Sequence, residues 1–288
     1  MARTAYVNGR FAPIGAATVP VEDRGYQFAD GVYEVLLVVD GMLWDAQGHF
    51  ARWRRSLSEL AIPLPMSEAS MRLVVRKLLR RNRLRNALVY MQATRGVAPR
   101  NHAFPVRPPA PSIVMTARPF DLPSANRKAE KGVRVILAED IRWGRVDIKT
   151  VSLLPNVLAK DAARRAGAIE AWLHRGRVVT EGASSNAWIV DPDGALVTHP
   201  KTNEILGGIT RESVMACAEE LQMKVIERPF TLEEASAARE AFITSATNLV
   251  TPVVTIGDRA VGGGAPGDVA LRLRRAYIDR SARLAAAV

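Results

Sequence analysis

The sequence predicts a mixed α/β protein built from two domains, and three observations lead to that prediction. Stretches with strand composition alternate with stretches of helical periodicity along most of the chain. The length of 288 residues suits one large domain or two modest ones. A polar stretch without an apolar period, residues 121–132, is expected to be an interdomain linker. The expected domains are therefore a smaller one at residues 1–120 and a larger one at residues 133–288.

The N-terminal part is predicted to hold strands and two helices. Strand composition marks residues 2–11, 31–39, 87–93 and 112–118, and Gly41 is expected to sit in a hairpin turn. A helix is expected from His49 to Leu60, because Phe50, Trp53 and Leu57 fall on one face while Arg52 lies off it. Apolar residues spaced as on one helix face predict a second helix near Met71–Arg85, with Ser67 as its N-cap.

The C-terminal part alternates between the two periodicities more regularly. Strands are expected at residues 133–139, 170–174, 187–190 and 195–198, and the last two form a hairpin around Asp191-Pro-Asp-Gly194. Helices are expected at residues 156–166, from about Thr210, and at residues 268–284. Gly262-Gly-Gly264 is expected to be a loop, since no dinucleotide-binding glycine pattern follows it.

Composition limits the protein class. Hydrophobic residues make up 48% and charged residues 24%, which is typical of soluble globular proteins. There is no apolar run of membrane-spanning length and no signal-peptide pattern near Met1, so no membrane partner is expected. The single cysteine, Cys217, excludes an internal disulfide and favours a cytoplasmic location. The histidines at 49, 174 and 199 show no metal-ligand spacing and are expected to be structural, so no metal is expected.

Much of the formal net charge of +11 comes from one segment of the chain. Seven of the cations lie between Met71 and Arg85, on the outer face of the predicted basic helix. Such a face can neutralise phosphates, so a basic nucleic-acid-binding protein is a remote alternative. No interleaved aromatic residues or nucleic-acid motif accompany it, which favours a solvated surface and no nucleic-acid partner.

A lysine and a carboxylate point to a specific chemistry. Lys149 lies where a strand-like segment changes into a loop, and Glu181 follows on a similar edge about thirty residues later. Pyridoxal phosphate chemistry needs a lysine that forms a Schiff base with the aldehyde and a carboxylate that holds the cationic ring nitrogen. The pair alone is weak evidence, because most lysines are surface charges.

A phosphate site is predicted where a glycine pair enters a helix. Gly207-Gly208 precedes the helix expected near Thr210. Free backbone N–H groups at a helix N-terminus bind phosphate without special side chains, and the hydroxyl of Thr210 adds a donor. The alternative is a plain N-cap threonine after a flexible glycine pair, and both can hold together.

Five segments occur in one order and resemble a known family. They are residues 23–35, 94–105, 147–149, 180–186 and 207–211. In their order and their residues, these segments resemble the class IV (fold-type IV) pyridoxal-phosphate-dependent aminotransferases, and among these most closely the D-amino-acid transaminases. The resemblance covers about residues 6–254. The resemblance implies a two-domain homodimer with the cofactor, pyridoxal 5'-phosphate, in the cleft between the domains.

The resemblance also implies roles for single residues. Arg52 and the backbone at Ile209 and Thr210 would bind the phosphate, and Leu206 would pack against the ring. Ala246 stands where the family commonly has a phosphate-binding threonine, so Ser245, Thr247 or a backbone N–H would have to replace that contact. The substrate carboxylate would be bound by the residues of a carboxylate trap, Tyr33, Arg100 and His102, with the loop residues reaching across the dimer. Arginine can bind a carboxylate through two parallel hydrogen bonds, which suits this role.

The expected activity is transfer of an amino group from a D-amino acid, such as D-alanine, to a 2-oxo acid, such as 2-oxoglutarate, in a ping-pong cycle. Lys149 would act as base and then as acid, and Glu181 would keep the pyridine nitrogen protonated. Branched-chain L-amino-acid transaminase, (R)-amine transaminase and aminodeoxychorismate lyase are alternatives within the same fold. The preferred side chain and amino acceptor stay open at this point.

Overall fold

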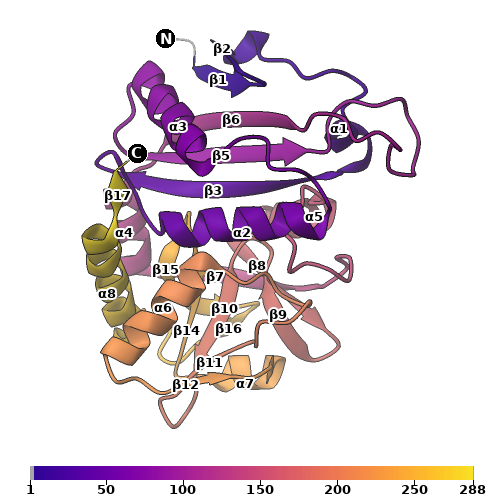
Figure 1. Cartoon of the computed structure of the whole chain (residues 1–288). Coiled ribbons are helices and arrows are strands. Elements are labelled where there is room, and N and C mark those ends of the chain that lie inside the picture. The colour runs from indigo at the N-terminus through magenta and orange to yellow at the C-terminus, as the bar shows by residue number, and fades with distance from the viewer. Residues whose placement is uncertain (1–2, 288) are drawn as a thin grey trace. The chain divides into compact units, whose positions relative to one another are not determined.

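The computed structural model describes residues 3–287, and these residues form two compact units (Figure 1). The first unit contains the chain up to Asp121, the segment Ile148–Ser152 and the chain end from Leu284. The second unit contains Leu122–Asp147 and Leu153–Arg283. No helix within residues 3–287 combines the length and the apolar content that a membrane span requires.

The first unit is built on a seven-stranded antiparallel sheet with the order β17-β4-β3-β5-β6-β1-β2. Its strands are β1 (Thr4–Val7), β2 (Arg10–Pro13), β3 (Gly31–Val39), β4 (Met42–Leu43), β5 (Ala87–Thr94), β6 (Ser112–Pro119) and β17 (Ala286–Ala287). The single strand expected at residues 2–11 is wrong, because Asn8 and Gly9 take positive φ angles of 42° and 91° and turn the chain into a hairpin. The turn expected at Gly41 is present between β3 and β4.

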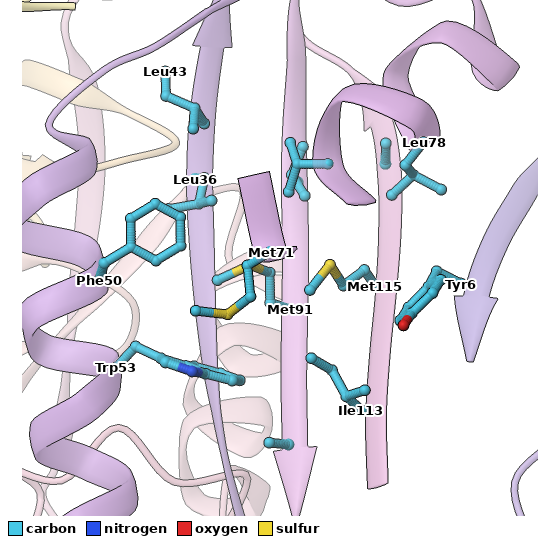
Figure 2. Packing of buried hydrophobic residues seen from close by; sticks show 14 of the residues in the cluster. Tyr6, Leu36, Leu43, Phe50, Trp53, Met71, Leu78, Met91, Ile113 and Met115 are labelled. Carbon is cyan, nitrogen blue, oxygen red and sulfur yellow. The ribbon is translucent and has the colours of Figure 1, made fainter. Parts of the chain in front are cut away.

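Two long helices pack against this sheet. The helices of the first unit are the 3-10 helix η1 (Ile14–Ala16), α1 (Arg24–Phe28), α2 (Ala46–Glu59) and α3 (Glu68–Asn82). Ser67 caps α3 as expected, and its hydroxyl accepts a hydrogen bond from Ser70 N. Phe50 and Trp53 of α2 and Met71 of α3 are buried against strand residues such as Leu36 and Met91 (Figure 2). Each such side chain contributes about 1.5–3 kcal/mol on burial, so this cluster fixes the position of α2 on the sheet.

The second unit is built on a ten-stranded mixed sheet with the order β12-β11-β10-β14-β15-β7-β8-β9-β13, and β16 pairs with β15. Its strands are β7 (Val133–Glu139), β8 (Glu170–Arg175), β9 (Val178–Gly182), β10 (Asn186–Val190), β11 (Leu196–Thr198), β12 (Val225–Glu227), β13 (Phe230–Thr231), β14 (Glu240–Ser245), β15 (Leu249–Ile256) and β16 (Arg259–Ala260). β7 runs parallel to both of its neighbours, β8 and β15, whereas β10 and β11 form the expected antiparallel hairpin.

The helices of the second unit are α4 (Leu122–Lys131), α5 (Leu154–Arg165), α6 (Ile209–Glu220), α7 (Leu232–Ala237) and α8 (Asp268–Leu284). Helix α4 replaces the polar linker expected at residues 121–132. Its inward residue Ala129 is fully buried, Asn126 accepts a hydrogen bond from Arg274 of α8, and Gly132 ends the helix with a φ of 70°. The apolar face of α4 consists of Leu122, Ala125 and Ala129 at helical spacing, and two of these three residues are alanine, so the short period was missed in the sequence.

Candidate active site

The segment around Lys149 is attached to the start of β3. Tyr33 N donates to the Lys149 carbonyl at 2.9 Å, and Val151 N donates to the Gly31 carbonyl at 3.1 Å. The preceding residue, Ile148, is 3% exposed and belongs to the core of the first unit. Lys149 therefore has a fixed backbone, although it lies in a loop.

The amine of Lys149 lies over an aromatic ring. Its Nζ is 4.2 Å from the ring centroid of Tyr33, and Tyr33 stacks on Tyr90 with a centroid distance of 5.6 Å. The Tyr90 hydroxyl donates to Gln92 Oε1 at 2.6 Å. Burial, and then the neighbouring Tyr33, raise the pKa of Tyr90, so this phenol stays protonated. The amine of Lys149 is thus oriented by a cation–π contact with the face of the Tyr33 ring.

Arg52 is held by a buried carboxylate of β3. Glu34 is fully buried and accepts hydrogen bonds from Arg52 Nε at 2.7 Å and Arg52 Nη2 at 2.9 Å, and it contacts His49 Nδ1 at 2.8 Å. Burial alone would raise the pKa of Glu34, but attraction to Arg52 and hydrogen bonds from Arg52 and His49 bring that pKa well below its usual range. The two parallel bonds fix the plane of the guanidinium, so Arg52 is preorganised.

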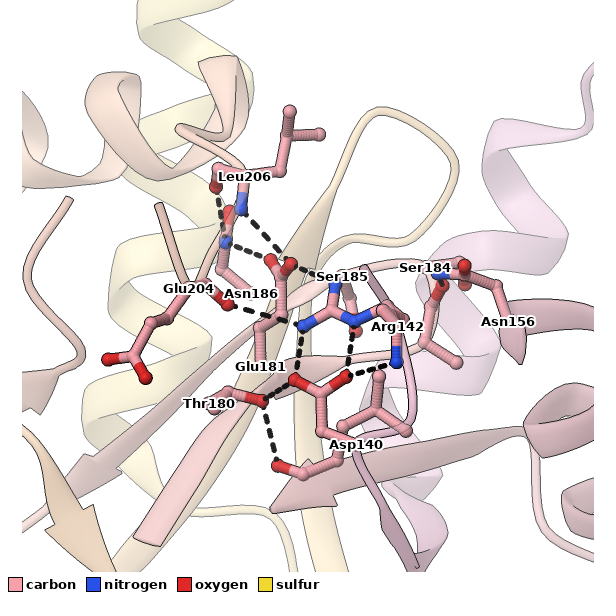
Figure 3. Close-up of polar contacts among 12 residues, drawn as sticks. Asp140, Arg142, Asn156, Thr180, Glu181, Ser184, Ser185, Asn186, Glu204 and Leu206 are labelled. Atoms are coloured by element: carbon pink, nitrogen blue, oxygen red, sulfur yellow. Dashed lines mark hydrogen bonds and ion pairs between the residues drawn. The ribbon is translucent and has the colours of Figure 1, made fainter. Parts of the chain in front are cut away.

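Glu181, at the end of β9, is surrounded by hydrogen-bond donors of the second unit (Figure 3). Arg142 Nη1 donates to Oε1 at 2.5 Å, and Leu206 N donates to the same oxygen at 3.0 Å. Asn186 Nδ2 donates to Oε2 at 2.9 Å and also to the Leu206 carbonyl at 2.8 Å. Because every one of these groups donates, the arrangement stabilises the ionised form of the carboxylate.

Arg142 joins two carboxylates. Its Nε and Nη2 donate to the two oxygens of Asp140, each at 2.8 Å, while Nη1 reaches Glu181. Burial alone would lower the pKa of Arg142, but hydrogen bonds to Asp140 and the charges of Glu181 and Asp140 raise it above its usual value. Burial would likewise raise the pKa of Asp140, and the hydrogen bonds from Arg142 lower it instead. Arg142 is therefore always charged and orients Glu181.

The glycine pair lies at the N-terminus of α6, as the sequence predicted. Gly208 is the N-cap of the helix, and no side chain caps it. A Cβ at Gly208 would lie 1.9 Å from Asn186 Oδ1, so only glycine fits beside the residue that holds Glu181. Ile209 and Thr210 follow in the first turn and are both buried. Backbone donors at this end can bind a phosphate, and Asn186 connects them to Glu181.

Ala246 lies in the tight turn between β14 and β15. The hydroxyls of Ser245 and Thr247 are 3.2 Å apart, and Ser245 Oγ also accepts from Asn248 N at 3.1 Å. These two hydroxyls hold the turn together, and only one of them has to donate in their mutual bond, so the other keeps a proton that a phosphate could accept. The contribution of Ala246 to a phosphate site therefore stays a prediction.

Arg100 and His102 lie in the loop between β5 and β6, and both are exposed. Both contact Phe28: the Arg100 guanidinium lies 5.2 Å from its ring centroid, and the His102 ring lies 5.3 Å from it. Tyr33, the third residue of the predicted carboxylate trap, instead contacts Lys149 and Tyr90. Within one chain the structure thus groups Arg100 with His102 and Tyr33 with Lys149.

The sequence prediction missed several residues that hold the expected ones. Arg142 and Asn186 orient Glu181, and Glu34 orients Arg52. Asn186 lies within a segment that the sequence already singled out, Thr180–Asn186, and Glu34 follows Tyr33 directly. Arg142 had no comparable signal, since its partner Glu181 lies 39 residues away.

Comparison with known proteins assigns the family. The amino-transferase class IV family matches residues 31–256. The chain belongs to the class IV aminotransferases. It is 43% identical to D-alanine aminotransferase of Staphylococcus haemolyticus over 272 residues, which is 94% of this chain and 95% of the relative. It is 40% identical to D-alanine aminotransferase of Bacillus licheniformis, over 93% of this chain and 94% of the relative.

Solved structures agree on the fold. The branched-chain aminotransferase of the thermophilic archaeon Thermoproteus uzoniensis, solved with norvaline, superposes with a TM-score of 0.84 at 25% identity, over 96% of this chain and 94% of that chain. The branched-chain enzyme of Escherichia coli gives a TM-score of 0.85 at 24% identity, over 98% of this chain and 95% of that chain, and supports the fold alone. A further branched-chain amino acid aminotransferase, solved with pyridoxamine 5'-phosphate, gives a TM-score of 0.88 at 26% identity. The predicted mixed α/β fold-type IV architecture is confirmed.

The residues around Lys149, Glu181 and the start of α6 fit the cofactor of this class, pyridoxal 5'-phosphate. A fixed lysine supplies an amine, a carboxylate held in its ionised form suits a protonated ring nitrogen, and an uncapped helix N-terminus suits the phosphate. The chain is a pyridoxal-phosphate-dependent aminotransferase. Each residue's contact with the cofactor stays a prediction.

Proposed function

We propose that this enzyme moves the amino group of a D-amino acid, such as D-alanine, to a 2-oxo acid, such as 2-oxoglutarate. The choice of D-amino acids rests on the identity of 43% with a D-alanine aminotransferase over 94% of the chain. The Arg100-x-His102 pattern supports it, because this pair places two donors for a carboxylate on one loop.

Lys149 attaches the cofactor and moves the proton. Bound pyridoxal phosphate supplies an electron sink that makes the α-proton of an amino acid removable. Once free, the amine of Lys149 would take that proton and return it to the carbon of the cofactor that receives the amino group. The hydrogen bonds to β3 hold the backbone of Lys149, and the Tyr33 ring orients its amine. Glu181, oriented by Arg142 and Asn186, keeps the ring nitrogen protonated.

The phosphate is bound by the start of α6 and by Arg52. Gly208 leaves the first turn of α6 without a side-chain cap, so the backbone N–H groups of Ile209 and Thr210 can donate to an anion. Arg52 adds a charge whose orientation Glu34 fixes. The side chain of Leu206 would pack against the cofactor ring.

The substrate carboxylate is bound by Tyr33, Arg100 and His102 in a homodimer. Their separation into two groups within one chain supports an arrangement in which the loop of one chain serves the site of its partner. Exposed apolar side chains near that loop, Phe104 and Val106, would be covered in such a dimer. A free, buried Cys217 fits a cytoplasmic location.

The test begins with Lys149→Ala in the full chain. This variant should lose nearly all D-alanine:2-oxoglutarate transamination and the absorbance of the attached cofactor at about 400 nm, because no amine remains to attach it. The exposed lysine variant Lys224→Ala is the matched control and should keep both signals. An active, coloured Lys149→Ala protein would end the assignment.

A second candidate is transamination of branched-chain L-amino acids. It is favoured by the branched-chain aminotransferase structures that superpose at TM-scores of 0.84–0.88 and 25–27% identity. Parallel assays with D-alanine and L-leucine, each with 2-oxoglutarate as acceptor, separate the two. A higher kcat/KM with L-leucine would replace the proposal. Pyruvate release from aminodeoxychorismate would indicate the lyase.

A further inference from the structure

One buried arginine, Arg24, holds the backbone of the loop that carries Arg100 and His102. Arg24, at the start of α1, is 2% exposed, and its guanidinium donates to three consecutive carbonyls of the loop. Nη1 donates to Asn101 O at 2.6 Å and Ala103 O at 3.4 Å, and Nη2 donates to His102 O at 3.3 Å. Among the described residues, the loop pairs with the segment before α1 only at its start, where Val97 forms an isolated bridge with Asp23. An exposed loop would otherwise sample many conformations, so the bonds from Arg24 restrict the backbone at His102.

A second layer fixes Arg24 itself. Its Nε donates to Asp30 Oδ2 at 2.8 Å, and the same carboxylate accepts from Arg95 Nε at 2.7 Å and from Arg95 Nη2 at 3.0 Å. Arg95 also donates to the Leu60 carbonyl at 2.7 Å, and its guanidinium lies 3.6 Å from the ring centroid of Phe104 in the loop. Asp30 thus binds both Arg24 and Arg95, and through these two buried arginines the loop is linked to the end of α2.

The side chains of the loop are oriented by Phe28, at the other end of α1. Its ring centroid lies 4.7 Å from the Arg24 guanidinium, 5.2 Å from the Arg100 guanidinium and 5.3 Å from the His102 ring. Arginine stacks on aromatic faces, so Phe28 limits the directions in which Arg100 can point. Helix α1 therefore controls both the backbone and the side chains of this loop.

We propose that Arg24 and Phe28 are positioning residues for recognition of the substrate carboxylate. This inference rests on the proposed function, because it assumes that Arg100 and His102 bind that carboxylate. Neither residue touches the substrate. They act by holding Arg100 and His102 in one arrangement before the substrate arrives, so their loss should weaken substrate binding and leave cofactor attachment intact.

The experiment compares Arg24→Met, Arg24→Lys and Phe28→Leu with the parent enzyme, loaded with pyridoxal phosphate. Arg24→Met and Phe28→Leu should raise the KM for D-alanine by about tenfold, with a smaller change in kcat and unchanged absorbance at about 400 nm. Arg24→Lys keeps the charge and one donor group and should restore part of the loss. Arg107→Met removes an exposed arginine of the same loop and should match the parent.

A double-mutant cycle separates a positioning role from a general structural role. In the Arg100→Met, His102→Gln background, Arg24→Met should have little further effect on the KM, because it acts through the residues already removed. An additive effect there would overturn the proposal, as would Arg24→Met and Phe28→Leu enzymes whose KM stays within about twofold of the parent. If Arg24→Met does not fold, the same cycle with Phe28→Leu decides.

The positioning role of Arg24 and Phe28 and the carboxylate-binding role of Arg100 and His102 can be tested separately. If Arg100→Met raises the KM and the α1 variants do not, only the positioning role is wrong. If Arg100→Met, His102→Gln itself leaves the KM for D-alanine unchanged, the carboxylate-binding role under the proposed function is wrong, and the positioning role is wrong with it.

Discussion

Arg142 shows how one residue controls the charge of a neighbouring site. Its side chain is 6% exposed, and it donates both to Asp140, whose side chain is fully buried, and to Glu181. Without Arg142, the buried carboxylates of Asp140 and Glu181 would lose the cation that they share. A guanidinium suits this position, because its planar fork binds Asp140 through Nε and Nη2 while Nη1 reaches Glu181.

We predict that Arg142→Met lowers the free energy of unfolding at pH 7 by about 3–5 kcal/mol, because it leaves buried charges uncompensated. Denaturant unfolding measures the change. Arg164→Met is the matched control, since the Arg164–Asp161 pair lies at the surface with Arg164 75% exposed and should contribute little. An Arg142→Met protein as stable as the control would show that this network does not hold the site.

The same variant changes the response to acid. The pKa of Asp140 is lowered in the folded protein, so its contribution to stability is present above the unfolded value of 3.8 and is lost as pH falls through the folded value. In Arg142→Met that contribution should be missing. The stability difference between parent and variant should therefore shrink as the pH is lowered from neutral to below about 4.

At the scale of elements, local patterns predicted most of the fold. The sequence signals for α2, α3, β3 and β5 are strong. In the two helices the apolar spacing agrees with the packing, and in the two strands the apolar runs do. The hairpin at Asn8-Gly9 was predictable from its turn residues, but the strand composition on both sides masked it. Helix α4 was not predictable, because its stability comes from Ala129 and Asn126 packing on distant elements.

The candidate site divides in the same way. The positions of Lys149 in a loop, of Glu181 near a strand end and of Gly208 at a helix start were predictable, because strand ends and helix starts have local sequence signals. The roles of these residues stay predictions. The contacts that give them their properties join residues far apart, such as Tyr33 with Lys149 and Arg142 with Glu181. Only the folded chain reveals those pairs.

The start of α6 gives a prediction at this scale. Gly208→Ala would place a Cβ 1.9 Å from Asn186 Oδ1, so Asn186 must move away from Glu181 and Leu206. We expect affinity for pyridoxal phosphate to fall by about tenfold or more, because the proposed contacts to the phosphate and to the ring nitrogen would be disturbed together. Cofactor release followed by absorbance measures this. Gly263→Ala, with nothing within 4 Å of the new Cβ, should behave as the parent.

At the scale of the whole molecule, two features point beyond one chain. The Arg100 loop and the residues before and within α1 expose large apolar side chains: Val106 is 100% exposed, Val21 77%, Tyr26 76% and Phe104 60%. Monomeric proteins rarely leave such side chains exposed together. The same loop carries Arg100 and His102, the proposed carboxylate-binding residues, and both contact Phe28, whereas Tyr33 contacts Lys149. Both features have one explanation if the loop is buried against a second copy and completes its site.

Mixing two impaired chains, assayed at a D-alanine concentration below the KM of the Arg100→Met enzyme, tests that explanation. Lys149→Ala and Arg100→Met chains each lack one residue of the proposed site. If the loop of one chain serves its partner, a mixed dimer has one intact site, in which Lys149 comes from the Arg100→Met chain and Arg100 comes from the Lys149→Ala chain. Equal coexpression should then restore about a quarter of the parent activity, since half of the dimers are mixed and each has one working site of two. Activity no higher than the sum of the separate variants would place Arg100 in the site of its own chain, because a mixed dimer would then contain no complete site.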